Sequence, residues 1–414
     1  MKAIINISRF LVGILFIFSG LIKANDPLSL GYKMQEFFEI WNDALSKSSF
    51  FLNHTLISLF QFLHEHSLAL AVIMIAFEII AGAALLLGWH MKLFGWLLLL
   101  LIIFFTFLTG YALLSGKFKN CGCFGDCLPI TPTTSFLKDI GLTVLISFLF
   151  WHRNKIRPIF SNKACNIAML IITILSFGIQ WYVLTYLPFA DCLPFKKGNN
   201  ISEKMKMPAG ARPDSFAIRF VYQKEGKDYE FSPAELPADL ANYKFVKRTD
   251  KLIRKGNAEP PIKGFNLSGI TDVDSTQIVL SQPYAILLFC EDFSVPVSKW
   301  KDGFSKIYTE ARSKNIPCYI VTTQPADALK AIAGTSFENI PVFKCDYTAI
   351  RTAARTNPCI YLLQEGTILD KWSYHDSGKA VKKLSSLIKQ PIHSGESIIP
   401  GDSMPPPVDT SKIK

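Results

Sequence analysis

Residues 93–114 read LFGWLLLLLIIFFTFLTGYALL, a run without a single charged side chain. A helix needs about 20 apolar residues to cross the hydrocarbon core of a bilayer. Backbone polar groups find no water partner in lipid, so such a run must be helical. Four further segments are long and apolar enough, or nearly so, to cross a bilayer as helices. They are residues 4–22, 67–88, 135–152 and 165–187. The first half of the chain is therefore predicted to be a bundle of five membrane-spanning helices.

The N-terminal stretch 1–26 combines a basic start with an apolar run, as a signal peptide does. No small-residue cleavage site follows it, and further spans do. We interpret it as a retained first helix. The formal charge of +11 forms no basic stripe interleaved with aromatic residues. Nucleic-acid binding is therefore excluded, and the charge is attributed to membrane topology and solubility.

The loop at 152–163, HRNKIRPIFSNK, sets the predicted orientation because it contains four basic residues and no acid. Such loops stay in the cytoplasm. Counting back along the spans puts the link at 88–92 and the N-terminus on the same side. The loops at 23–66 and 115–134 and everything after 187 then face the opposite side. The prediction is a bacterial inner-membrane protein with a cytoplasmic N-terminus and a periplasmic C-terminal half, where disulfides persist.

The 23–66 loop contains YKMQEFFEIWNDAL at 32–45, an amphipathic helical pattern. Two interpretations of this predicted helix remain open. It lies at the membrane interface, or it packs over the mouth of the bundle of membrane-spanning helices.

Glu78 stands near the middle of the second span, where an ionisable group normally faces the bundle interior. Arg9 and Lys23 are its candidate partners. Ser19 and Lys23 are four residues apart and share a face of the first span. The alternatives are a polar group that only packs helices together, and a proton relay or quinone-side contact.

The stretch KNCGCFGDC at 119–127 holds three of the nine cysteines. Gly122 lets the backbone close the small ring of a Cys121–Cys123 disulfide, and strain in such a ring raises its reduction potential. A redox dithiol is thus one interpretation, with Cys127 and Cys192 as resolving or structural partners. The others are a structural disulfide from Cys121 or Cys123 to Cys192, buried inert thiols, and metal binding by three thiolates. No nearby histidine completes a metal set, so no metal is predicted.

The segment at 9–27, RFLVGILFIFSGLIKANDP, resembles the opening of DoxX-type membrane proteins. CGCFGD at 121–126, followed by SFLKDI at 135–140, resembles MauE-like members of that superfamily. The resemblance covers about residues 1–150 and continues into 187–201. It implies a four-helix membrane core, here with a fifth helix, in the layout of Bacteroidetes members that carry a periplasmic extension. MauE is linked to disulfide handling in methylamine dehydrogenase maturation, so the resemblance implies a redox or biogenesis role.

The second half of the chain looks like soluble protein. Residues 215–222 alternate like a strand, and 223–232 look like a hairpin return. From 262, an expected opening hairpin is followed by strands that alternate with helices and close on a hairpin around Gly366. A last helix is expected at 376–389. This βαβ plus ββα plan resembles the thioredoxin fold, in its TlpA or peroxiredoxin-like form, over 262–389.

Thioredoxins carry Trp-Cys-Gly-Pro-Cys after the second strand, and residues 293–297 match that position. Ser294 replaces the first cysteine, Val297 replaces the second, and Pro296 is kept. The dithiol is gone, and with it the ordinary thioredoxin reaction. Asn357-Pro358 matches the cis-proline loop, so Pro358 is predicted to follow a cis peptide.

Two further side-chain questions follow from this match. Ser294 has no histidine or acid placed to activate it, so it is not expected to be a nucleophile. Cys290 and Cys359 lie on neighbouring strands and are expected to be buried free thiols, with a disulfide as the alternative.

The predicted organisation is a four-helix membrane domain at 1–160, a fifth helix at 161–190, a mixed linker region at 191–261, a thioredoxin-like domain without CxxC at 262–389, and a disordered tail at 390–414. The leading hypothesis is a membrane thiol–disulfide oxidoreductase or maturation component. Its partners would be the lipid bilayer and a periplasmic thiol protein, with no bound cofactor and a quinone as the candidate electron partner. The rivals are a non-catalytic scaffold that binds a partner through its thioredoxin-like domain, and a transporter that uses Glu78.

Overall fold

The computed structural model describes residues 1–48, 52–116, 118, 125–128, 130–212, 215–224, 226–233, 235–237, 240–254, 256, 259–269 and 272–390. The tail from residue 391, predicted to be disordered, lies outside this part, as do Cys121 and Cys123.

Five helices of the N-terminal half are long and apolar enough to cross a membrane. Their ends fall within a few residues of the predicted spans, so the predicted membrane bundle is confirmed. They are α1 (Lys2–Asn25), α4 (Ser67–Leu87), α5 (Met91–Ser115), α6 (Pro132–Trp151) and α7 (Asn162–Thr185).

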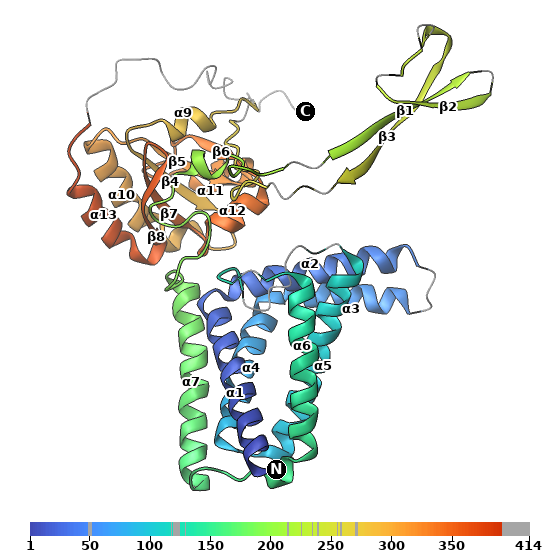
Figure 1. Cartoon of the computed structure of the whole chain (residues 1–414). Helices are drawn as coiled ribbons and strands as arrows, with labels where there is room; N and C mark the ends of the chain where they lie inside the picture. The colour runs from blue at the N-terminus through green and yellow to red at the C-terminus, as the bar shows by residue number, and fades with distance from the viewer. Residues whose placement is uncertain are drawn as a thin grey trace, which may run out of the picture.

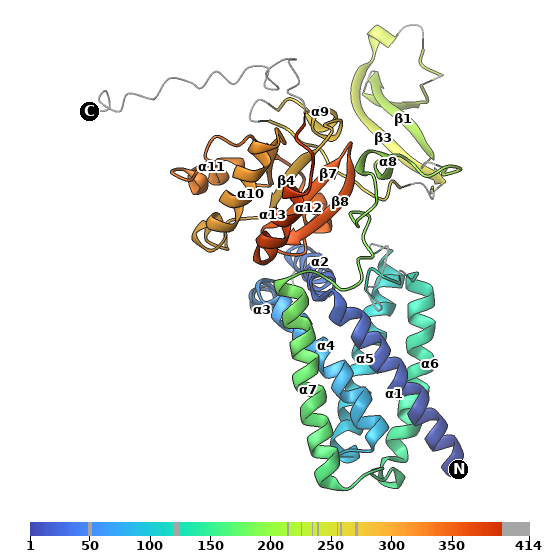
Figure 2. The same cartoon turned by 90° about the vertical axis from the view of Figure 1, so that its left-hand side faces the viewer.

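Helices α1, α4, α5 and α6 form a four-helix core, and α7 packs outside it against α1 and α4 (Figures 1 and 2). Glycine allows α1 and α4 to approach closely. A Cβ atom at Gly20 would lie 2.5 Å from Ile79, and one at Gly82 would lie 2.9 Å from the Gly13 carbonyl oxygen. The contact between these two helices therefore depends on small residues, as is common in membranes.

The two ends of the bundle differ. The N-terminus and the α4–α5 and α6–α7 connections lie at one end (Figure 1). The α5–α6 connection and the whole C-terminal half lie at the other, which we call the docking end (Figure 1). There, α2 (Pro27–Ser46) and α3 (Asn53–Glu65) form a hairpin across the bundle. The amphipathic pattern at 32–45 thus lies over the bundle mouth, with Phe37 and Phe38 buried.

The C-terminal domain is built on a five-stranded sheet in the order β6-β5-β4-β7-β8. β4 pairs parallel with β5, and β5 pairs parallel with β6. β7 pairs antiparallel with β4 and with β8. This is the predicted βαβ plus ββα plan of the thioredoxin fold. The strands are β4 (Ala285–Cys290), β5 (Cys318–Thr322), β6 (Val342–Lys344), β7 (Cys359–Gln364) and β8 (Thr367–Ser373).

Helices cover both faces of this sheet. On one face, α10 (Lys301–Ser313), α11 (Pro325–Ile332) and α13 (Ser377–Ser385) bury a core around Phe304 and Phe337. On the other face, α9 (Thr276–Leu280) and α12 (Tyr347–Ala353) pack with Phe195 and Phe265. The last helix is shorter than the predicted 376–389.

One sequence expectation needs correction. The opening hairpin expected after residue 262 is only an isolated bridge between Ser268 and Asp274, followed by α9. Asp274 accepts a hydrogen bond from the Thr276 amide at the start of this helix, which diverts the chain from a second strand. The region predicted to be mixed around 201–260 contains the short helix α8 (Ile201–Lys204), a 3-10 helix (Leu240–Asn242) and an antiparallel sheet of three strands.

The three strands of this sheet are β1 (Ser215–Lys224), β2 (Lys227–Phe231) and β3 (Lys244–Arg254). The sheet projects away from both the bundle and the thioredoxin-like domain (Figures 1 and 2). The first two strands are the predicted hairpin. β3 was missed because its sequence, KFVKRTDKLIR, is rich in charge and lacks a clean alternation.

Candidate functional site

A disulfide joins Cys127 to Cys192 at the docking end, with their Cα atoms 4.9 Å apart. It links the α5–α6 connection to the segment that leaves α7. Sequence analysis named both cysteines as partners, but considered a bridge to Cys192 only from Cys121 or Cys123. The chain is therefore held at Cys127, four residues after Cys123 of the Cys-Gly-Cys motif.

Arg355 ties the thioredoxin-like domain to this point. It is 4% exposed, and its Nε atom donates to Asp26 Oδ2 at 2.8 Å. Its Nη2 atom donates to Asp126 Oδ2 at 3.2 Å. Burial raises the pKa of the Asp26 carboxyl, an effect that the charge of Arg355 partly offsets. One guanidinium thus joins the end of α1, the cysteine loop and the segment before Pro358.

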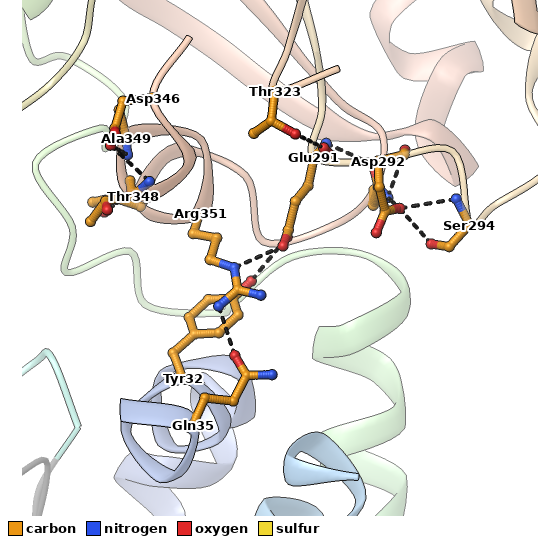
Figure 3. A network of polar contacts seen from close by, with 12 residues as sticks. Tyr32, Gln35, Glu291, Asp292, Ser294, Thr323, Asp346, Thr348, Ala349 and Arg351 are labelled. Carbon is orange, nitrogen blue, oxygen red and sulfur yellow. Dashed lines mark hydrogen bonds and ion pairs between the residues drawn. The ribbon is translucent and has the colours of Figure 1, made fainter. Parts of the chain in front are cut away.

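A second contact joins α2 to the loop that follows β4 (Figure 3). Arg351 donates from Nε to Glu291 Oε1 and from Nη1 to Gln35 Oε1, both at 2.7 Å. Its guanidinium lies over the ring of Tyr32 at 4.3 Å, and the Tyr32 hydroxyl donates to Glu291. The edge of the domain that holds the former active-site loop therefore faces the bundle.

That loop keeps its shape without cysteines. The Asn357-Pro358 peptide bond is cis, as predicted. Asn357 bridges to the loop by accepting from the Glu291 amide and donating to Asp292. Ser294 does have an acid beside it, because Asp292 accepts from both its amide and its hydroxyl. Asp292 Oδ1 also accepts from Asn357, so it acts as the cap of a turn.

The other two positions of the former motif are structural. Pro296 precedes a short 3-10 helix (Val297–Lys299), and the Val297 side chain packs against the domain core. Neither position offers a reactive group.

The four cysteines of the domain are free and buried. Burial raises the pKa of Cys345 and of Cys359 to about 11. The pKa values of the Cys290 and Cys318 thiols are raised further, again by burial. Since the thiolate is the reactive form, these side chains are inert near neutral pH. The prediction that Cys290 and Cys359 are buried free thiols is confirmed.

Inside the bundle, Glu78 pairs with Lys23, one of its two suggested partners, at 2.6 Å. Arg9 lies elsewhere. It donates to the carbonyl oxygens of Leu85 and Leu86, at the C-terminal end of α4. Ser19, Lys23 and Glu78 line one small cavity, as the shared face of the first span predicts.

A larger cavity of about 400 Å³ lies between α2, α3, α4 and α5. Its walls are aromatic and aliphatic, with Phe38, Trp41 and Phe77 among them. Phe37, also in the wall, stacks on Phe118 with ring centroids 4.1 Å apart. Phe118 comes three residues before Cys121 in the sequence.

The sequence patterns did not point to the charged and polar residues that build the interface: Asp26, Tyr32, Asp126, Glu291, Arg351 and Arg355. The available signals were Asp26 before Pro27, which marks a helix start, and Arg355 close to the cis-proline. Neither pattern says which distant residue will be the partner. Among the described residues, no group of three or more histidine, cysteine or acidic side chains could hold a metal ion.

Five apolar helices joined to a thioredoxin-fold domain without its dithiol define a multi-pass membrane protein with a thioredoxin-like domain. Residues 1–152 match the family described as methylamine utilisation protein MauE, which confirms the resemblance of the membrane half. Residues 216–255, the projecting sheet, match a domain of unknown function.

Among curated proteins, the chain is similar to Protein TlpB of Flavobacterium psychrophilum, with 32% identity over 104 residues. This match spans a quarter of each chain. Among solved structures it is similar to copper-bound yeast Sco1, with 15% identity and a TM-score of 0.25, over 31% of this chain and 94% of that one. It is also similar to BsSco, described as a member of the Sco family of cytochrome c oxidase assembly proteins. That match has 13% identity and a TM-score of 0.22, over 30% of this chain and 96% of that one.

Proposed function

We propose that this protein is a thiol–disulfide redox or protein-maturation component of a bacterial inner membrane, acting on the periplasmic side through Cys121 and Cys123. One observation carries the proposal. The residues that follow the Cys-Gly-Cys motif are fixed by the Cys127–Cys192 disulfide and by the Asp126–Arg355 ion pair. Both attachments lie beside the cis-proline edge of a thioredoxin fold that has no dithiol of its own.

The proposed step is thiol–disulfide exchange. A thiolate of a reduced partner protein attacks one sulfur of the Cys121–Cys123 disulfide, and a mixed disulfide forms. The partner's second thiol then attacks its own sulfur in that bond. The partner leaves oxidised, and Cys121 and Cys123 are both reduced, with two electrons and two protons transferred.

The thioredoxin-like domain would hold the partner while this exchange occurs. Its cis-proline loop keeps the thioredoxin geometry, and Arg355 fixes that loop to Asp126 of the cysteine segment. Its own thiols are buried and protonated, so they do not compete.

The reduced dithiol needs an electron acceptor, and a membrane quinone fits the cavity of about 400 Å³. The aromatic and aliphatic walls of this cavity suit the planar ring and the isoprenoid tail of a quinone. The reaction balances, since dithiol and quinone give disulfide and quinol. The quinone would be a diffusing substrate and not a resident cofactor.

A scaffold role is the second candidate. It is favoured by the use of Glu291 and Arg351 in contacts with α2, which turns the former active-site loop into a structural joint. A scaffold needs Arg355 and Arg351 but not Cys121 or Cys123.

Thiol trapping in intact cells separates these candidates. Cells are quenched with acid, and free thiols are alkylated in the wild type and in the Cys121→Ser and Cys123→Ser variants. We expect mixed disulfides with partner proteins that depend on these two residues and change with periplasmic redox load. Cys165→Ala, which removes a buried thiol of α7, serves as the matched control and should leave the adducts unchanged. Cysteines that stay fully reduced or fully oxidised under every load would sink the redox proposal.

A further inference from the structure

Four charged side chains surround one cavity in the half of the bundle nearest the docking end. Lys23 of α1 pairs with Glu78 of α4 at 2.6 Å. Lys138 pairs with Asp139, both of α6, at 3.0 Å. Glu78 is 4% exposed and Asp139 is 1% exposed. The two pairs line the same cavity, although three different helices supply them.

Stability does not explain these charges. An ion inside a membrane is costly, and its pairing in a low-dielectric interior seldom repays the full cost of removing it from water. Most side chains buried in this core are apolar, so aliphatic side chains would serve packing at least as well. Intramembrane ionisable groups are therefore functional by default.

Size and charge restrict what the cavity holds. Its volume of about 30 Å³ equals the share of one water molecule in the liquid. Two lysines and two acids sum to zero, so the group offers no net charge to a bound ion. Each carboxylate already faces an ammonium group, which disfavours a divalent cation. Of the candidate occupants of this cavity, water and protons remain.

The cavity is closed on the side away from the docking end. Its lining there is Phe16 of α1, Ile102 of α5 and Leu142 of α6. Ser8 and Arg9 are buried further along α1, but neither lines the cavity, and Arg9 donates to the carbonyl oxygens of Leu85 and Leu86. The apolar lining between the cavity and Arg9 argues against a continuous polar path through the described bundle.

Toward the docking end the surroundings are polar. The Lys138 side chain is 26% exposed, and the Thr109 hydroxyl donates to Asp139 Oδ2 at 3.0 Å. Ser135 lies one turn before Asp139, is fully buried, and its Oγ atom has no hydrogen-bond partner among the described residues. A buried hydroxyl of this kind is usually satisfied by water. Thr109 and Ser135 thus extend the polar surroundings from Asp139 toward the end that carries the cysteine loop.

We propose that Lys23, Glu78, Lys138 and Asp139 form a proton-transfer site that opens only to the docking end. The inference rests on the proposed function, because thiol–disulfide exchange requires a group that accepts and donates protons. The attacking thiol must lose a proton, and the leaving thiolate must gain one. A carboxylate of the site takes up the first proton through water and returns it to the second sulfur, so the site ends unchanged.

Time-resolved infrared difference spectroscopy on the full chain in membranes tests this. Spectra are recorded during the exchange, after the oxidised protein is mixed with dithiothreitol, and thiols are counted in the same samples when the reaction ends. We expect a transient carboxylic-acid band that shifts in D₂O, disappears in Glu78→Gln or Asp139→Asn, and persists in the control Glu36→Gln on α2. A changed thiol count without such a band, or a band kept in both variants, overturns the inference alone. An unchanged thiol count overturns the proposed function, and this inference with it.

A double variant separates a loss of proton transfer from a loss of folding. Lys23→Met combined with Glu78→Met replaces the pair by apolar side chains, which often keeps or raises stability. We expect it to fold normally but to exchange disulfides about 100-fold more slowly, the usual size of a general acid–base contribution. Wild-type exchange rates in a folded double variant would show that the pair is only structural.

Discussion

Cys127 and Cys192 at the docking end differ from the cysteines of the thioredoxin-like domain in pairing and in burial. Cys127 and Cys192 are joined to each other where the two halves of the molecule meet. The four domain cysteines are free, buried and protonated at neutral pH. The domain has kept its sheet and its cis-proline while replacing both motif cysteines by Ser294 and Val297. In this chain the fold persists without the chemistry, and the remaining candidates for thiol exchange belong to the bundle.

Charged contacts between the membrane bundle and the thioredoxin-like domain use the former active-site edge of that domain. Arg355 holds the cis-proline edge against Asp26 and Asp126, and Arg351 holds the former active-site loop against α2. The domain is thereby oriented by charged groups whose partners come from segments hundreds of residues away. Loosening the contact should separate a domain that still folds from a bundle that still spans the membrane.

Arg355→Met should have the largest effect on the contact. It leaves Asp26 buried without its partner, and breaking one side of a buried ion pair costs about 3–5 kcal/mol. Hydrogen exchange should rise in α2 and around residues 187–200, while β4 and β5 stay protected. Adding Asp26→Asn should recover part of the loss, because the orphaned charge is then gone. Unchanged exchange in α2 would show that Arg355 does not hold the halves together.

Removing the Cys127–Cys192 disulfide should have the next largest effect. The bridge closes a loop across a sequence separation of 65 residues, and such cross-links contribute about 2–4 kcal/mol. We expect the Cys127→Ser, Cys192→Ser double variant to melt earlier in detergent and to lose the sensitivity to reductant that the wild type shows. Cys165→Ala is the control. A wild-type melting curve that is indifferent to reductant would contradict a stabilising bridge.

The sequence was a good guide to everything that depends on local pattern. Apolar runs predicted the five spans and the buried central strands of the domain, and alternation predicted β1, with β2 as its hairpin return. The match at Asn357-Pro358 predicted the cis peptide. These features arise from short-range rules of hydrophobicity and backbone geometry.

The interface could not be predicted in the same way. Asp26 and Arg355 are separated by 329 residues, and nothing in either neighbourhood specifies the other. Of the two partners suggested for Glu78, only packing could choose Lys23 and send Arg9 to the end of α4. β3 was missed because its charges hide the alternation of an edge strand. Pairing across long sequence separations is a property of the assembled fold.

The smallest predicted effect concerns the inert thiols and has a definite sign. Burial raises the pKa of Cys359 from the ordinary 9.0 to about 11 in the folded domain. A raised pKa stabilises the folded state fully below pH 9, and that stabilisation is lost as the pH rises toward 11. The loss for this thiol is on the order of 1–3 kcal/mol. Alkylation of Cys359 in the full chain should therefore accelerate steeply over this window, as the domain opens more often.

Other groups titrate at alkaline pH, so a comparison isolates the thiol. Cys359→Ala removes one titrating group, and the free energy of unfolding of this variant should fall less between pH 9 and pH 11 than that of the wild type. Identical slopes would mean that the Cys359 thiol ionises as easily in the fold as in the unfolded chain. In that case the Cys359 thiol would not be inert, and thiol exchange could no longer be assigned to the bundle alone.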